Sequence, residues 1–227
     1  MSYYELTRDG KVFILTMTNG DNDNRFTSDV LVELNKHIDT MENSEGNASM
    51  ILTSTHEKTW STGIHLDWML SLKYDKLIAF TQELKRTLLR IALLNMPTIA
   101  CITGNCYAAG AIMASGFDFR LMRQDRGRFC FPEVNIKIPF GMTFTKIISQ
   151  LPNKHALNEL ALTGAAWGAV ECLPKNVVDA IYSAEELSQK AMDLAQTMAE
   201  KDRQTYTTIK HELRADLVEM QRSDNIQ

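Results

Sequence analysis

The chain has 227 residues, of which 44% are hydrophobic and 23% charged, with a formal net charge of −4 and a pI near 5.8. We expect one domain around a single core, because a chain of this length buries about 70% of the surface that it exposes when unfolded. The acidic balance and the lack of long Lys/Arg blocks argue against nucleic-acid and membrane-surface binding, and no apolar run approaches the roughly 18 residues of a membrane span.

The first hundred residues alternate between strand and helix patterns. Residues 3–7 and 11–18 alternate around Asp9-Gly10 as a hairpin does, and the polar loop 19–24 follows. A helix is expected from Thr27 or Ser28 to about residue 41, with its apolar stripe at Val30, Leu31, Leu34 and Ile38. Further on we expect a strand at 50–55, a helix at 80–94 and, after Pro97, a strand at 98–103. This order predicts an α/β fold with parallel crossovers and a ligand at the carboxyl ends of the strands.

After Pro152 the pattern becomes helical. We expect helices at 154–162, 167–172, 184–201 and 205–221, with one short strand at 177–181. No repeat or low-complexity linker separates the two halves. We therefore predict a core at residues 1–152 that carries the ligand site, and a helical subdomain of the same unit at 153–227.

Two turns rich in small residues stand out as candidate binding elements. In the first, Ala108 to Ala111 lie between an apolar strand and a helix, so the bare N–H groups of a helix start are open to a ligand. A second turn, residues 61–67, also follows an apolar strand. Two such turns can direct two backbone donors at one oxygen, which makes an oxyanion hole. The alternative is that the small residues only let a helix pack closely on a sheet.

The motifs of the chain, taken together, resemble those of the crotonase, or enoyl-CoA hydratase/isomerase, superfamily over nearly the whole length. Ser61 to Asp67 resemble a small-residue, glycine and Asp-Leu segment of that family, although here His65 intervenes and the acidic residue follows Leu66. Four later motifs match the family's spacing: Ile102-Thr103-Gly104, Ala108-Ala109-Gly110 with Asp118, Phe131-Pro132-Glu133, and Leu162-Thr163-Gly164 with Val177-Val178-Asp179. The resemblance implies the crotonase-like fold, a spiral of ββα repeats with a C-terminal helical part.

The resemblance also implies a set of site residues. The N–H groups of Ile64 and Ala109 would hold the thioester oxygen of an acyl-CoA, and Glu133 would be the catalytic carboxylate. Where the hydratases carry a first glutamate, this chain has Ile112, which cannot activate water. One carboxylate beside an oxyanion hole suits proton transfer, so the pattern resembles the monofunctional delta3,delta2-enoyl-CoA isomerases. The remaining substrate-binding candidates are Gly63, His65, Gly110 and Phe140.

Partners and cofactors follow from the same resemblance. An acyl-CoA is the expected substrate, no cofactor is needed beyond the coenzyme A that it carries, and a homotrimer or a dimer of trimers is the expected assembly. The five histidines show no metal-binding spacing such as HExxH, and the cysteines lack CxxC spacing, so no metal site is expected. The cysteines lie in apolar segments and should be buried free thiols: Cys101, Cys106, Cys130 and Cys172.

Several alternatives stay open at this point. Glu133 can instead face solvent on a strand, His65 can simply bond to backbone in its loop, and Asp67 can cap the segment that follows. Arg25 and Lys73 are candidates for the CoA phosphates or plain surface charges. Another crotonase-type reaction (thioester hydrolysis, decarboxylation or hydration) or a catalytically silent acyl-CoA-binding protein remains possible. A dinucleotide-binding dehydrogenase is excluded because GxGxxG is missing after the first strand.

The compartment is a further expectation. Residues 1–5 show no secretory pattern, and the last four residues do not form a Ser-Lys-Leu peroxisomal signal. Buried free thiols suit a reducing environment. We expect a bacterial cytoplasm, with a peroxisome as the alternative.

Overall fold

The computed structural model describes residues 2–224, and within that range the larger of two β-sheets has the strand order β1-β2-β3-β5-β7-β10. β1 and β2 form the expected antiparallel hairpin, and every later neighbour in this sheet pairs in parallel. The expectation of parallel crossovers is therefore confirmed. The strands are Tyr4–Asp9, Val12–Met17, Ser49–Ser54, Thr98–Ile102, Phe119–Arg123 and Ala180–Tyr182.

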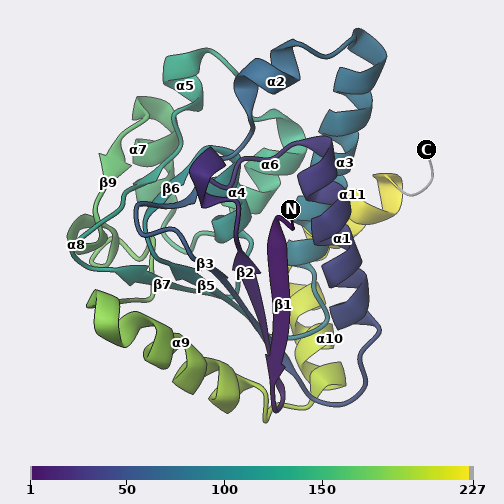
Figure 1. Cartoon of the computed structure of the whole chain (residues 1–227), viewed down its shortest axis with the longest axis vertical. Coiled ribbons are helices and arrows are strands. Elements are labelled where there is room, and N and C mark those ends of the chain that lie inside the picture. The colour runs from purple at the N-terminus through teal and green to yellow at the C-terminus, as the bar shows by residue number, and fades with distance from the viewer. Residues whose placement is uncertain (1, 225–227) are drawn as a thin grey trace.

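A second, smaller sheet lies beside the first and has the order β4-β6-β8-β9 in the described chain. Its strands are Thr59–Ser61, Asn105–Tyr107, Phe129–Cys130 and Ala166–Trp167. Three of them follow a strand of the larger sheet directly, as β3 leads to β4, β5 to β6 and β7 to β8, and a helix comes next each time. The chain thus repeats a strand–strand–helix unit, and in Figure 1 the helices α2 and α5 lie at the top of the molecule with α4 below them.

Helices cover both faces of the larger sheet. α9 (Ala184–Met198) lies alone beneath it in Figure 1, and its Leu187, Ala191 and Ala195 pack on Ile51 and Ile99 of the sheet. The other face carries the larger core, to which α1 (Ser28–Glu42) and α3 (Tyr74–Ala92) contribute their apolar stripes. The remaining helices are η1 Gly20–Asn22, α2 Leu66–Leu70, α4 Ala109–Ser115, α5 Glu133–Ile136, α6 Gly141–Ile148, α7 Lys154–Thr163, α8 Ala169–Cys172, α10 Arg203–Leu213 and α11 Ala215–Asp224.

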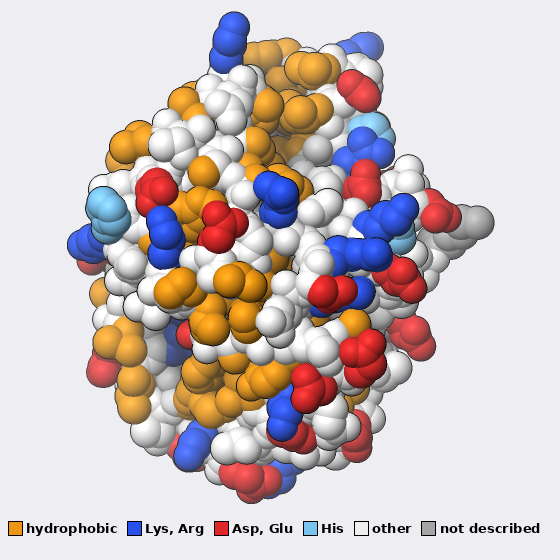
Figure 2. Space-filling model, turned by 90° about the vertical axis from the view of Figure 1, so that its left-hand side faces the viewer, with side chains coloured by type: hydrophobic (Ala, Val, Ile, Leu, Met, Phe, Trp, Pro, Cys, Tyr) orange, Lys and Arg blue, Asp and Glu red, His pale blue; other side chains and the backbone are white. Residues whose placement is uncertain are grey.

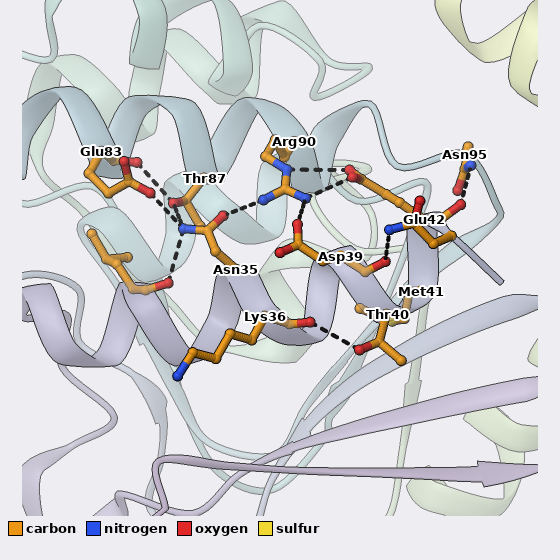
Figure 3. A network of polar contacts seen from close by, with 12 residues as sticks. Asn35, Lys36, Asp39, Thr40, Met41, Glu42, Glu83, Thr87, Arg90 and Asn95 are labelled. Atoms are coloured by element: carbon orange, nitrogen blue, oxygen red, sulfur yellow. Dashed lines mark hydrogen bonds and ion pairs between the residues drawn. The ribbon is translucent and has the colours of Figure 1, made fainter.

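A polar network fastens α1 to α3 (Figure 3). The Asn35 side-chain amide donates to Glu83 and Thr87 at 2.8 Å each, and Arg90 donates to the Asn35 side-chain oxygen Oδ1 at 2.8 Å. Arg90 also pairs with Asp39 at 2.6 Å and Glu42 at 2.7 Å. A cleft of about 540 Å³ lies along this network. Because the side chains of Asn35 and Arg90 bond to groups of the facing helix, we assign this network to helix docking.

The C-terminal helices are held by a buried ion cluster. Lys210 lies 2.7 Å from an Asp118 carboxylate oxygen and also donates to the carbonyl oxygens of Leu94 and Met96. Arg214 reaches the other Asp118 oxygen at 3.0 Å. The single helix expected at 205–221 is therefore wrong, because the chain breaks into α10 and α11 at Arg214, where this side chain turns inward.

Other sequence predictions need correction. The strand expected at 177–181 is β10, which spans only Ala180–Tyr182. The helix expected at 167–172 is a strand ending at Trp167 followed by a helix from Ala169, with Gly168 at its N-cap. α3 begins at Tyr74, six residues earlier than expected. The four cysteines are buried free thiols, as predicted. Within residues 2–224, no helix combines the length and the apolar character that a membrane crossing requires.

Candidate active site

The site is built around a strained turn between β6 and α4. Ala108 has φ 49° and ψ −128°, a backbone conformation that L-residues rarely adopt, and it makes the chain reverse into α4. Its own N–H donates to the Cys130 carbonyl oxygen, which ties the turn to β8. The next residue, Ala109, is the first of α4, and N–H groups in the first turn of a helix have no acceptor inside the helix. The turn therefore presents the positive end of α4 at the surface of a cavity.

The second small-residue turn packs directly against the first. A Cβ added to Gly63 would lie 2.6 Å from the Ala109 nitrogen, and one added to Gly110 would lie 2.5 Å from the Ser61 carbonyl oxygen. Gly63 also has φ +83°, in the region that favours glycine. The two glycines thus allow backbone-to-backbone contact of the turns. Neither lines the cavity itself.

The orientation of Ile64 follows from its pairing with Phe26. In this parallel bridge the Phe26 N–H donates to the Gly63 carbonyl oxygen at 2.7 Å, and the His65 N–H donates to the Phe26 carbonyl oxygen at 3.1 Å. Backbone groups of successive residues in an extended chain point to opposite sides. The Ile64 N–H therefore points away from Phe26 and is not used in this pairing.

Both turns border an apolar cavity of about 270 Å³, called the inner cavity here. The structure brings five of the predicted residues together in its lining: Ile64, Ala109, Ile112, Glu133 and Phe140. The cavity opens at the end of the molecule where α2 and α5 lie in Figure 1, and in Figure 2 hydrophobic side chains surround a hollow at this end.

Glu133 supplies the carboxylate of the inner cavity. It is the first residue of α5, after Pro132, and it is only 6% exposed. Its Oε2 has no hydrogen-bond partner within the described chain. Burial in this apolar lining raises the pKa of Glu133 to about 7. The alternative of a solvent-facing strand residue is wrong, and the group is poised to exchange a proton near neutral pH.

His65 is the N-cap residue of α2. Its Nδ1 accepts a hydrogen bond from the Trp68 N–H at 3.3 Å, so His65 caps α2. Asp67, expected as the cap, lies inside the first turn instead. The capping geometry supports a backbone-bonding role, and contact of His65 with a substrate stays a prediction.

The candidates for the CoA phosphates lie outside the lining of the inner cavity. Arg25 donates from Nε to the Asn22 carbonyl oxygen at 2.9 Å, and Lys73 precedes α3 as its N-cap residue. Their role toward a CoA ester stays a prediction. In the part of the chain that the structure describes, no group of three or more His, Cys, Asp or Glu side chains can hold a metal ion.

Sequence reasoning missed part of the lining. Tyr107 contributes from β6, directly before the strained turn, so its position next to Ala108 was an available signal. Leu66, Ile136, Ile138 and Phe144 also line the cavity. Leu66 comes from α2, Ile136 and Ile138 from α5 and the residues directly after it, and Phe144 from α6, so no single motif spacing joins the three places.

The fold is of the crotonase type, as the sequence predicted. The structure of an enoyl-CoA hydratase/isomerase family protein from Pseudomonas syringae matches it with a TM-score of 0.89 at 20% identity, covering 98% of this chain and 94% of the other. That of a probable enoyl-CoA hydratase from Mycobacterium tuberculosis gives a TM-score of 0.89 at 19% identity, covering 98% and 92%.

The sequence profile of the enoyl-CoA hydratase/isomerase family matches residues 7–227, so the chain belongs to this family. A protein named enoyl-CoA delta isomerase 3 from Arabidopsis thaliana is 28% identical over 95% of this chain and 93% of its own length. A short-chain-enoyl-CoA hydratase from Clostridium acetobutylicum is 27% identical over 84% of this chain and 72% of its own.

Proposed function

We propose that the chain is a delta3,delta2-enoyl-CoA isomerase that moves the double bond of a 3-enoyl-CoA into conjugation with its thioester. One observation carries the proposal: the inner cavity pairs a single buried carboxylate, Glu133, with two backbone turns, and its lining has Ile112 where a second carboxylate would serve hydration. The names of the similar Arabidopsis proteins, enoyl-CoA delta isomerase 3 and the peroxisomal enoyl-CoA delta isomerase 2, support it.

The oxyanion hole is the first part of the mechanism. The N–H groups of Ile64 and Ala109 donate to the thioester oxygen and stabilise the negative charge that develops there when a C2 proton leaves. Loss of one such donor typically costs about 100- to 1,000-fold in rate. The start of α4 adds its dipole to the same point.

Glu133 is the second part. Its ionised carboxylate takes a proton from C2, the electron pair of the C–H bond forms the dienolate, and the carboxyl group then returns the proton to C4. The double bond ends between C2 and C3, and Glu133 is again ionised. A pKa near 7 suits a group that must both accept and donate a proton at neutral pH. The reaction needs no cofactor beyond the coenzyme A of the substrate.

The test is turnover of 3-hexenoyl-CoA and 3-decenoyl-CoA by the full chain, followed as formation of the conjugated 2-enoyl thioester. We expect Glu133→Gln to retain folding and ester affinity while turnover falls by about 100- to 10,000-fold. Retention of more than about a tenth of the activity would remove Glu133 from the mechanism.

The same preparations separate the rival functions. Thioester hydrolysis releases free CoA, decarboxylation requires an acidic acyl group, and hydration consumes 2-enoyl-CoA. Binding without turnover of any of these esters would identify a silent acyl-CoA-binding protein. Light scattering will test the proposed trimer or dimer of trimers.

A further inference from the structure

A second hollow adjoins the inner cavity. It is an open groove of about 650 Å³ lined by residues of α5, α6 and α7 and the segment between α5 and α6, called the outer groove here. It shares four lining residues with the inner cavity: Glu133, Ile138, Pro139 and Phe140. A ligand that fills the inner cavity can therefore continue into the outer groove past this shared wall.

The outer groove is bordered by exposed apolar side chains. Leu162 is 74% exposed, Met142 67% and Val134 49%. Single exposed hydrophobic residues are ordinary, but several around one groove mark a surface that binds an apolar partner. Its polar lining consists of Glu133, Lys137 and Thr145.

Phe140 stands at the junction. It lines both hollows, is half-buried, and packs edge-on against Phe131 with ring centroids 5.8 Å apart and an interplanar angle of 86°. The inner cavity alone, at about 270 Å³, is smaller than the roughly 300–1,000 Å³ of typical small-molecule sites. It suits the reacting carbons of an acyl chain better than a long chain as a whole.

We propose that the outer groove holds the distal part of the acyl chain, so that the chain passes Phe140 and the substrates are enoyl-CoAs of medium length, about eight carbons or more. The proposal rests on the proposed function, from which it takes the acyl-CoA ligand. The outer groove is continuous with the inner cavity that contains Glu133. This continuity favours the acyl chain of the ligand as the occupant of the groove. A second copy of the protein could cover the groove without any opening into the inner cavity, so it would leave the continuity unexplained.

The test measures binding and not turnover, so that it does not depend on the reaction. Dissociation constants of butyryl-, hexanoyl-, octanoyl- and decanoyl-CoA are determined by calorimetry on the full chain. Full burial of a methylene is worth about a fourfold gain in affinity, and an open groove gives part of this. We expect affinity to rise at least about tenfold from butyryl- to decanoyl-CoA.

A double variant in the outer groove and a control variant elsewhere test whether the groove causes the dependence of affinity on acyl-chain length. Leu162→Ser combined with Met142→Ser makes the groove polar and should flatten the dependence on chain length while butyryl-CoA affinity stays within about twofold of wild type. Leu213→Ser is the control, because Leu213 is 80% exposed on α10 and lines neither hollow. The control should keep the full chain-length dependence.

The outcomes separate the two proposals. A rising affinity without isomerase turnover supports the groove and rejects the isomerase, whereas turnover with affinity independent of chain length rejects the groove. If the double variant dissociates an oligomer in sedimentation and leaves the chain-length dependence intact, the groove is a contact between copies of the chain and the proposal is wrong.

Discussion

Replacing Glu133 by Gln should stabilise the protein, and more so as the pH rises. The pKa of Glu133 is raised from 4.5 to about 7 by burial, so ionising this group in the folded state opposes folding. The folded state holds the Glu133 proton more tightly than the unfolded state, so stability is lost as the pH rises from one pKa to the other. The penalty is absent below pH 4.5, grows between pH 4.5 and 7, and is complete above pH 7. At about 1.4 kcal/mol per pKa unit, the full penalty is roughly 3 kcal/mol.

Glutamine has nearly the same shape and does not ionise, so the variant escapes this penalty. We expect the free energy of unfolding of Glu133→Gln, relative to wild type, to increase by about 2 to 3 kcal/mol between pH 5 and pH 8. Urea denaturation at both pH values measures it, with Glu171→Gln as the control, because Glu171 is exposed on α8. If the difference in unfolding free energy between Glu133→Gln and wild type stays constant with pH, the pKa of the Glu133 carboxyl is not raised by burial.

The remaining predictions concern the same site. The kcat/KM for isomerisation should fall about tenfold per pH unit below a midpoint near 7, because Glu133 must be ionised to take the C2 proton; a flat profile from pH 5 to 8 would contradict this role. Gly63→Ala should cost at least about 100-fold in turnover, since its Cβ would lie 2.6 Å from the Ala109 nitrogen, and wild-type rates would argue against the oxyanion hole. Ala108→Gly should raise Tm by about 2–4 °C by relieving the strained φ, net of glycine's entropy, and a lowered Tm would show that no strain is stored there. Hydration of 2-enoyl-CoA should proceed at a small fraction of the isomerisation rate because Ile112 cannot activate water, and comparable rates would reject the one-carboxylate mechanism.

The sequence predicted those parts of the fold in which local pattern and tertiary packing agree. The hairpin was recognisable from the turn residues Asp9-Gly10 between two alternating segments, and the helix from Thr27 was recognisable because its stripe from Val30 to Ile38 is buried. The smaller sheet was not, since strands such as β8 and β9 have two residues each and are too short to show a period. The break at Arg214 was also hidden, because the helical pattern continues through it, whereas the partners of the Arg214 side chain, Asp118 among them, are distant in sequence.

The candidate site also has parts that the sequence predicted and parts that only the three-dimensional structure shows. Small residues at 108–111 signalled the turn, but only the three-dimensional arrangement shows that Gly63 must touch Ala109. The neighbourhood of Glu133 was read correctly as apolar, whereas its alternation with Phe131 fitted a strand as well as a helix start. His65 caps α2 with a ring nitrogen, a role for which residue preferences favour Asp67.

The ion cluster around Asp118 makes the packing of the larger sheet depend on residues far along the chain. Asp118 belongs to the segment that leads into β7, next to the edge strand β10, whereas its cationic partners Lys210 and Arg214 lie in α10 and directly after it. Without them the buried Asp118 carboxylate would keep the Thr98 N–H and hydroxyl donors but no cation, and removal of one partner from a buried pair typically costs about 3 to 5 kcal/mol. A variant cut before α10 should therefore stay incompletely packed and open to proteases, because α10 and Arg214 supply the charges that the sheet needs in order to bury Asp118.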